Sequence, residues 1–271
     1  MNSKLAALAC LIGCAAQAQI RPTSISVPPV VIYDFANGSM QVEVVATASI
    51  KTTDMPYDRG VAVRQALDLP AVYGWSKREM LLINGGSATG STDRPEGLLV
   101  SSGNTASFAS QKKLSADPKS DCEMRRRERL KLAGLLCVAE ADQIRIGPFS
   151  NEAAATCRHA VQSGPLLVEN NRATVCPTSP NERPSYRTVA CTSGQQVKII
   201  VTEKPIDLFE LSKWLATDAN GPRCDWALSL GDNFGSGAFY SPRNAYQLNK
   251  KSSFHGLGVY PVPSFIVVRQ R

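Results

Sequence analysis

The side chain best placed for chemistry is a single carboxylate, Asp232, in a glycine-rich stretch near the C-terminal end of the chain. Residues 226–240 read WALSLGDNFGSGAFY, so an apolar run gives way to small and polar residues and then resumes. This pattern predicts a strand, a turn and a second strand. Glycines let the backbone approach a ligand closely, and a side chain at a strand end can be held rigidly while facing a cleft. The alternative is a structural hairpin turn capped by Asp232.

Two more polar positions follow apolar runs. Asn84 ends the run at residues 80–83 and precedes Gly85 and Gly86. Its amide can donate to and accept from sugar hydroxyl groups, while the alternative is an ordinary Asn-Gly turn. Ser163 stands in the sequence QSGP before the predicted strand 166–168. It lacks the GxSxG pattern and a partner histidine, so we interpret it as a ligand-binding hydroxyl or a turn residue, not as a nucleophile.

Arg187 begins a further predicted strand at residues 186–190. A guanidinium can hold a phosphate through two parallel hydrogen bonds, which a lysine cannot copy. The alternative is an ordinary surface arginine on an edge strand.

Taken in order, these stretches resemble the phosphodiester glycosidase family. The similarity rests on LINGG at 82–86, RPEGLLV at 94–100, QSGPLLV at 162–168, Arg187-Thr188 and the Asp232 turn, and it covers roughly residues 75 to 240. This family includes the N-acetylglucosamine-1-phosphodiester alpha-N-acetylglucosaminidase that uncovers mannose 6-phosphate, and many bacterial secreted relatives, the branch that this chain resembles.

The resemblance implies a secreted glycosidase, a hydrolase that cleaves a sugar-1-phosphodiester bond in a cell-surface or envelope glycan. Cleavage develops positive charge on the sugar and negative charge on the phosphate, so Asp232 would stabilise or capture the cation, or activate water, while Arg187 holds the phosphate. The resemblance assigns substrate binding to five further residues: Asn84, Gly85, Ser163, Gly164 and Ser236. Glu96 and Asp225 are the next candidate carboxylates.

One departure from the family keeps a second hypothesis open. The family usually has Leu-Asp-Gly-Gly followed by serines, whereas this chain has Leu230, Gly231, Asp232 and Asn233. A one-residue shift on a strand turns a side chain to the other face, unless a bulge at Gly231 restores it. The alternative function is therefore a catalytically degenerate envelope protein that binds a glycan or a polyanion.

The elements that position these residues predict an α+β fold with a mixed, largely antiparallel β-sheet core, a few flanking helices and disulfide bonds. Helices are predicted at 59–67, at 151–161 and after Asp207, where a carboxylate cap precedes an apolar face. The pair Asn37-Gly38 predicts a hairpin between strands at 30–33 and 40–48. Further strands are predicted at 80–83, 135–140, 143–146, 166–168, 197–202, 226–230 and 254–268.

The chain divides into a signal peptide at 1–18, a Pro-rich lead-in at 19–29 that forms a tether or edge segment, and a single domain at 30–271. That domain contains a polar basic insertion at about 101–134, with the run RRRERLK at 125–131. We interpret the run as a solvated helix, with binding to an anionic polymer as the alternative. Export and the lack of interleaved aromatic residues disfavour a nucleic-acid partner.

The leader predicts a periplasmic or secreted protein. Lys4 precedes an apolar run at 5–16, and Ala16-Gln17-Ala18 offers the small residues that a signal peptidase needs. A lipobox-like sequence ending at Cys14 gives the alternative of an outer-membrane lipoprotein with a lipid anchor there. No other stretch approaches 18 consecutive apolar residues, so no transmembrane span is expected.

Charge and cysteine count agree with export. The net charge of +7 becomes +6 when Lys4 is removed, which suits a sugar phosphodiester or an anionic envelope glycan. Six cysteines remain outside the leader, enough for three disulfides, and sequence leaves their pairing open, with Cys122–Cys137 and Cys176–Cys191 as local candidates. We expect no metal and no cofactor, because CxxC spacing is absent and the only histidines are His159 and His255.

Overall fold

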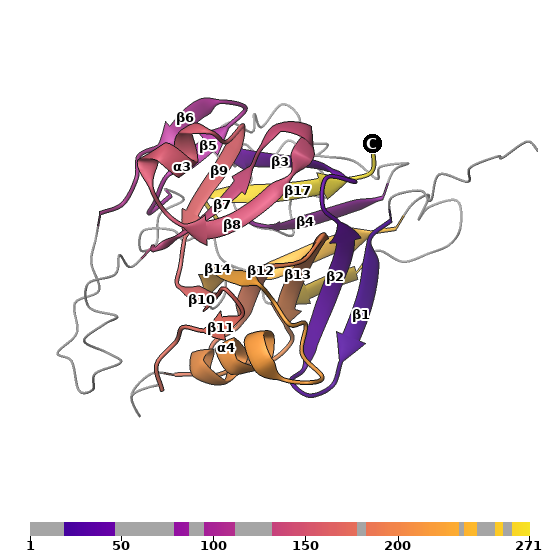
Figure 1. Ribbon diagram of the computed structural model, residues 1–271. Coiled ribbons are helices and arrows are strands. Elements are labelled where there is room, and N and C mark those ends of the chain that lie inside the picture. Colours follow the sequence, from indigo (N-terminus) through magenta and orange to yellow (C-terminus); the bar gives the residue numbers. More distant parts are fainter. Residues whose placement is uncertain are drawn as a thin grey trace, which may run out of the picture.

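Three antiparallel β-sheets meet around one interior in the computed structural model (Figure 1). It describes residues 19–46, 79–86, 95–111, 132–177, 183–232, 236–242, 253–256 and 262–271. The α+β prediction is wrong, because strands dominate these ranges and the α-helices within them are two short ones. These are α3 (Asn151–Ala155) and α4 (Leu208–Thr217), accompanied by a single 3-10 turn, η3 (Glu140–Asp142).

The largest sheet has seven strands, among them β12 and β14, which carry Arg187 and Asp232. In spatial order they are β1 (Arg21–Ile25), β2 (Val30–Ala36), β13 (Gln196–Thr202), β12 (Arg187–Ser193), β14 (Trp226–Asp232), β10 (Leu166–Glu169) and β11 (Arg172–Ala173). The Pro-rich lead-in therefore contributes β1, an edge strand.

Two five-stranded sheets pack on the other side of the interior. The first consists of β16 (Ser253–Gly256), β15 (Gly237–Ser241), β4 (Met80–Asn84), β17 (Ser264–Arg269) and β3 (Gln41–Ala46). The second consists of β6 (Asn104–Ser107), β5 (Leu99–Ser101), β9 (His159–Ser163), β7 (Gly134–Val138) and β8 (Ile144–Pro148).

Alternation along the strands of the seven-stranded sheet gives it two apolar faces. In β13, Val197, Ile199 and Val201 enter the central core shared by all three sheets, whereas Ile200 belongs to a second core under α4. Buried apolar residues on both faces explain why these strands read as nearly continuous apolar runs. Figure 1 shows α4 beside β10 and β11 at this outer face.

Helix α4 confirms the prediction made from its cap and its apolar spacing. Asp207 is the N-cap, and its carboxylate accepts hydrogen bonds from the backbone N–H groups of Phe209 and Glu210 at 2.9 and 3.1 Å. Leu211 and Leu215 are fully buried in the outer core. Helix α3 is shorter than the predicted 151–161, because the chain enters β9 at His159. The predicted helices at 59–67 and 125–131 lie outside the described residues.

The hairpin predicted around Asn37-Gly38 is wrong, although the turn itself is present. Gly38 has a φ of +74° and the N–H of Ser39 donates to the carbonyl of Ala36 at 3.1 Å. The strands on either side belong to different sheets, since β2 pairs with β1 and β13 while β3 pairs with β17. The turn thus carries the chain from one sheet to another. By contrast, the strands predicted at 135–140 and 143–146 correspond to β7 and β8, which pair with each other.

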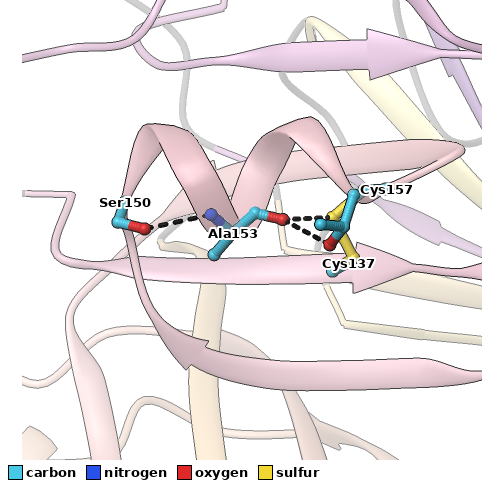
Figure 2. The surroundings of a disulfide bond; sticks show 5 residues. Cys137, Ser150, Ala153 and Cys157 are labelled. Carbon is cyan, nitrogen blue, oxygen red and sulfur yellow. Dashed lines mark hydrogen bonds between the residues drawn. A yellow bond between two sulfur atoms is a disulfide. The ribbon is translucent and has the colours of Figure 1, made fainter.

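Disulfides join residues that are distant in sequence, so both local pairings considered above are wrong. Cys137 on β7 is bonded to Cys157, which follows the Ser150-capped helix α3 (Figure 2). Cys191 on β12 is bonded to Cys224, just before β14. Cys176 is disulfide-bonded as well.

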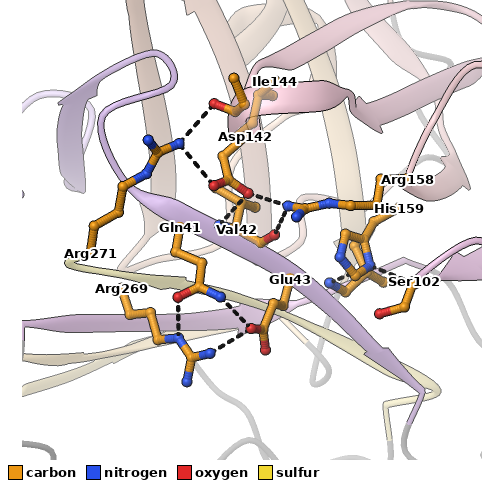
Figure 3. Close-up of polar contacts among 12 residues, drawn as sticks. Gln41, Val42, Glu43, Ser102, Asp142, Ile144, Arg158, His159, Arg269 and Arg271 are labelled. Carbon is orange, nitrogen blue, oxygen red and sulfur yellow. Dashed lines mark hydrogen bonds and ion pairs between the residues drawn. The ribbon is translucent and has the colours of Figure 1, made fainter.

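Strand β3 is the edge of its sheet, yet its outer backbone groups are buried and bonded by side chains of the neighbouring sheet (Figure 3). The N–H of Val42 donates to Asp142, and its carbonyl accepts from Arg158. The N–H of Val44 donates to Nδ1 of His159 at 3.3 Å, and its carbonyl accepts from Ser101 at 2.7 Å. These side chains replace the next strand and remove an exposed sheet edge.

Asp142 also connects the C-terminal residue, Arg271, to this network of hydrogen bonds. Its carboxylate pairs with Arg158, and with Arg271 at 2.9 Å (Figure 3). Asp142 has a φ of +60°, a conformation that non-glycine residues seldom adopt. The bonds that its carboxylate makes hold this residue in place, so the network is a structural joint between sheets.

His159 is an uncharged acceptor within this joint. Nδ1 accepts from the N–H groups of Val44 and Ser102, and the residue is 3% exposed. Burial lowers the pKa of His159 below its usual 6.5, and Arg158 lowers it further, against opposing effects of Glu43 and Asp142. Below pH 6.5 the unfolded chain therefore binds a proton that the folded chain does not, and stability falls as the pH falls.

We predict that His159→Gln flattens this pH dependence. Glutamine can still accept a hydrogen bond from the backbone but cannot be protonated. Between about pH 7.5 and about pH 5, the parent protein should lose more free energy of unfolding than the variant, by up to about 1.4 kcal/mol per pH unit for one linked proton. Urea unfolding at both pH values measures this. Equal losses in the two proteins would show that His159 is not the linked group.

Candidate functional site

Strand ends from all three sheets converge where the sequence placed its candidate site. Strand β4 ends at Asn84, β9 ends at Ser163, β12 begins at Arg187, β14 ends at Asp232, and β15 begins at Gly237. The side chains described below link these ends. The structure therefore brings together four of the five stretches on which the sequence prediction rests.

The side chain of Asn84 links the end of β14 to the start of β15. Its Nδ2 donates to the carbonyl of Leu230 at 3.1 Å, and its Oδ1 accepts from the N–H of Gly237 at 3.2 Å. Thr188 also accepts from this N–H, at 2.9 Å. Asn84 is 1% exposed. In the described structure its amide thus bonds backbone groups of the turn, not a surface open to a ligand.

A β-bulge lies in β14 immediately before Asp232. Opposite β12, Ser229 pairs with Val189 and Gly231 pairs with Thr188, so the bulge contains one extra residue, Leu230. Asp232 is consequently the cross-strand partner of Arg187. Without the extra residue, Gly231 would occupy that position. The bulge considered from the sequence was at Gly231; in the structure it lies one residue earlier, at Leu230, and Gly231 is paired with Thr188.

Ser163 supports the same turn from the β9 side. Its Oγ donates to the carbonyl of Ser229 at 2.7 Å, and the Oγ of Ser229 donates to the carbonyl of Gly231 at 3.2 Å. Both serines are fully buried. Bulges leave carbonyl groups outside the regular ladder, and such groups need other donors when they are buried. The two serines supply them.

Arg187 is 8% exposed, which makes it a buried arginine and not the surface residue of the alternative interpretation. Its backbone N–H donates to Oγ1 of Thr202 on β13 at 2.8 Å. Ser236, fully buried, donates from Oγ to the carbonyl of Tyr186 at 3.3 Å. Ser236 thus joins the far arm of the turn to the start of β12.

The two predicted glycines differ in their surroundings. Gly85 pairs with β17 through its N–H and the carbonyl of Ser264 at 2.8 Å, and a Cβ there would lie 2.6 Å from the Ser264 hydroxyl oxygen. Close backbone approach explains why this residue is glycine. Gly164 is half-buried in the turn between β9 and β10, and its contacts do not assign it a role.

The structure separates the two reserve carboxylates. Asp225 precedes β14 and accepts from the N–H of Gly194 at 2.6 Å, so it lies at the opposite end of the strand from Asp232. Glu96 is half-buried next to Gly97, where a Cβ would lie 2.9 Å from the carbonyl of Gln162. Glu96 therefore belongs to a segment that passes next to Gln162, the neighbour of Ser163, whereas Asp225 lies at the far end of β14 from the site.

Sequence reasoning assigned no role to three polar residues that organise the site: Thr188, Thr202 and Ser229. Each is buried, at 0%, 1% and 0% exposed. Buried polar residues need hydrogen-bond partners. The available signal was Ser229 between Leu228 and Leu230, where a hydroxyl interrupts an apolar strand.

Gln162, next to Ser163, binds backbone groups of three nearby residues with its side-chain amide. Its Oε1 accepts from the N–H groups of Leu98 and Ser110 at 3.0 and 2.8 Å. Its Nε2 donates to the carbonyls of Ser110 and Leu132 at 2.9 and 3.0 Å. One buried amide therefore fixes the chain on both sides of residues 112–131.

Within the described ranges, no group of three or more histidine, cysteine, aspartate or glutamate side chains could hold a metal ion. No helix in the same part of the chain is long and apolar enough to cross a membrane.

Comparison with known proteins finds a likeness in structure alone. No protein-family model and no curated protein sequence match the chain. The catalytic domain of zebrafish N-acetylglucosamine-1-phosphodiester alpha-N-acetylglucosaminidase, auto-inhibited by pro-peptide, is similar with a TM-score of 0.54 and 10% identity over 94% of this chain and 82% of that one. A hypothetical protein from Synechocystis is similar with a TM-score of 0.54 and 12% identity, over 94% of this chain and 62% of that one.

At 10 and 12% identity, these similarities indicate a distant relationship in fold. They support the resemblance to the phosphodiester glycosidase family at that level, and they do not place the chain in its bacterial secreted branch. This chain spans a little under two thirds of the Synechocystis protein.

The close approach of Asn84 to Gly231 gives a prediction for the bulge. A Cβ at Gly231 would lie 2.5 Å from Nδ2 of Asn84, so Gly231→Ala should force the amide away and lower the free energy of unfolding by about 1 to 3 kcal/mol. Gly147→Ala on β8 is the control, because no atom lies within 4 Å of a Cβ there. Thermal melting of both variants measures the difference. Equal melting temperatures would show that the bulge can accept a side chain.

Proposed function

We propose that this protein is a periplasmic or secreted hydrolase, a glycosidase that cleaves a sugar-1-phosphodiester bond in a cell-surface or envelope glycan. The observation that carries the proposal is the cross-strand position of Asp232 opposite Arg187, produced by the bulge at Leu230. Directly opposite residues of an antiparallel ladder have Cβ atoms about 5 Å apart. A carboxylate and a guanidinium at such positions can act on two neighbouring atoms of one substrate.

The charges suit the proposed reaction. Water supplies the oxygen that ends on the anomeric carbon, and the bond from that carbon to the phosphate oxygen breaks. The phosphate leaves with the bonding electrons as a phosphomonoester, and one water proton is released. Positive charge grows on the sugar ring near Asp232 and negative charge on the phosphate near Arg187. The phosphate leaves readily without a proton, so a strong general acid is not required.

Three further observations support the proposal. The fold resembles a catalytic domain whose name describes a phosphodiester glycosidase. The net positive charge favours an anionic substrate. The disulfides Cys137–Cys157 and Cys191–Cys224 suit an oxidising compartment such as the periplasm or the extracellular space.

A second candidate is an envelope protein that binds the same glycan without turnover. It is favoured by the sequence after Asp232, in which Asn233 and Phe234 stand where the family that the chain resembles usually has two glycines. Incubation of the mature protein with a panel of sugar phosphodiesters separates the two candidates. Released sugar supports the hydrolase, and binding without release supports the alternative.

For the hydrolase, we predict that Asp232→Asn removes turnover and leaves affinity intact. The variant preserves shape but lacks the charge that a cationic transition state needs, so kcat should fall about a thousandfold, roughly 4 kcal/mol. Substrate affinity and melting temperature should be unchanged. A variant that turns over at the parent rate would transfer the catalytic role to another carboxylate, with Glu96 the next to test.

We also predict that Arg187→Lys separates phosphate recognition from sugar recognition. Lysine keeps the charge and loses the planar fork. Binding of a phosphodiester should weaken by about 1.5 to 3 kcal/mol, while binding of the matching neutral sugar should not change. Calorimetry with both ligands measures this. Equal losses for the two ligands would make Arg187 part of the scaffold.

A further inference from the structure

Side chains from two other sheets bind the end of β14, and one of them also binds the start of β15, which changes the roles of two predicted substrate-binding residues. Asn84 bonds the carbonyl of Leu230 and the N–H of Gly237, which lie on opposite sides of the turn that carries Asp232. The amide of Asn84 on β4 therefore links the end of β14 to the start of β15.

Ser163 acts on the same segment from β9. It bonds the carbonyl of Ser229, and Ser229 in turn bonds the carbonyl of Gly231. The bonds run along the bulge itself, from the residue before Leu230 to the residue after it. Since the bulge decides which residue lies opposite Arg187, Ser163 contributes to the register of Asp232.

Burial argues against direct contact of either side chain with substrate. Asn84 is 1% exposed and Ser163 is fully buried, and both use their polar atoms on backbone groups. A ligand could reach them only if these bonds broke, which would leave buried carbonyl groups without donors.

We propose that Asn84 and Ser163 are positioning residues that hold Asp232 in register with Arg187, and that neither binds the sugar. This inference rests on the proposed function, and it deepens that function by assigning catalytic geometry to the joint between three sheets. Small displacements of a reacting group lower the rate strongly, whereas they change the binding of the ground state little. Loss of either residue should therefore act on kcat.

The structure offers a matched control for Ser163. Ser212 on α4 is also fully buried and also donates one hydrogen bond from Oγ to a strand carbonyl, that of Leu167, at 2.5 Å. It does so in the outer core, on the face of the seven-stranded sheet that packs against α4. Ser163→Ala and Ser212→Ala thus remove the same kind of bond in two places.

The test compares kcat, KM and melting temperature for Ser163→Ala, Ser212→Ala and Asn84→Ala on a sugar phosphodiester that the parent hydrolyses. We expect both serine variants to lose similar stability. Ser163→Ala and Asn84→Ala should lower kcat about tenfold or more with KM within about twofold, and Ser212→Ala should leave both constants unchanged. A raised KM with an unchanged kcat would make the residue a substrate ligand, and an unchanged kcat and KM would make it scaffold. Either result overturns the proposal.

A second measurement does not depend on activity. Hydrogen exchange of the Gly237 amide, followed by NMR, should be faster in Asn84→Ala than in the parent or Ser212→Ala, because that N–H loses one of its two acceptors, Asn84, and keeps Thr188. Exchange at the parent rate would overturn the positioning role. If the parent protein releases no sugar from any phosphodiester while the exchange result holds, the proposed function fails and the positioning of the turn stands.

Discussion

The structure depends on one constraint: where separate sheets meet in a buried interior, every backbone N–H and carbonyl that the sheets leave unpaired needs another partner. Strand β3 meets this demand with side chains from the neighbouring sheet, of which Asp142 and His159 are the main acceptors. The turn after β14 meets it with Asn84 and Ser163. Both joints use polar side chains that bind buried backbone groups, and in the first of them Asp142 also pairs with Arg158 and Arg271.

This constraint explains why polarity alone did not identify ligands. Asn84, Ser163 and Ser236 stand out in the sequence because a polar residue in an apolar context is unusual. Such a residue can face a substrate or can satisfy a buried backbone group, and sequence does not distinguish the two. All three bond backbone in the structure. What the sequence located correctly was the place where strand ends converge, and what it could not give was the direction of each side chain.

Elements defined by neighbouring residues could be predicted from the sequence, whereas pairings between residues far apart in the chain could not. The cap at Asp207 and the spacing of apolar residues after it define α4, because both act within a few residues. Sheet membership depends on partners far along the chain: β2 and β3 follow one another across a turn yet join different sheets, and Cys191 is bonded across 33 residues to Cys224. The α+β prediction failed for a related reason, because most short apolar runs in the described part of the chain formed strands, and its α-helices are the two short ones, α3 and α4.

The bulge at Leu230 decides which residue of β14 lies opposite Arg187. Side chains alternate along a regular strand, so one extra residue in the ladder changes every pairing beyond it. With the extra residue, Asp232 is opposite Arg187, and without it Gly231 would be. A Cβ at Gly231 would lie 2.5 Å from Nδ2 of Asn84, so a side chain there would force the amide to move. Gly231 and Asn84 therefore act together. The missing side chain at Gly231 leaves room for the Asn84 amide, and this amide binds the carbonyl of Leu230, the extra residue of the bulge.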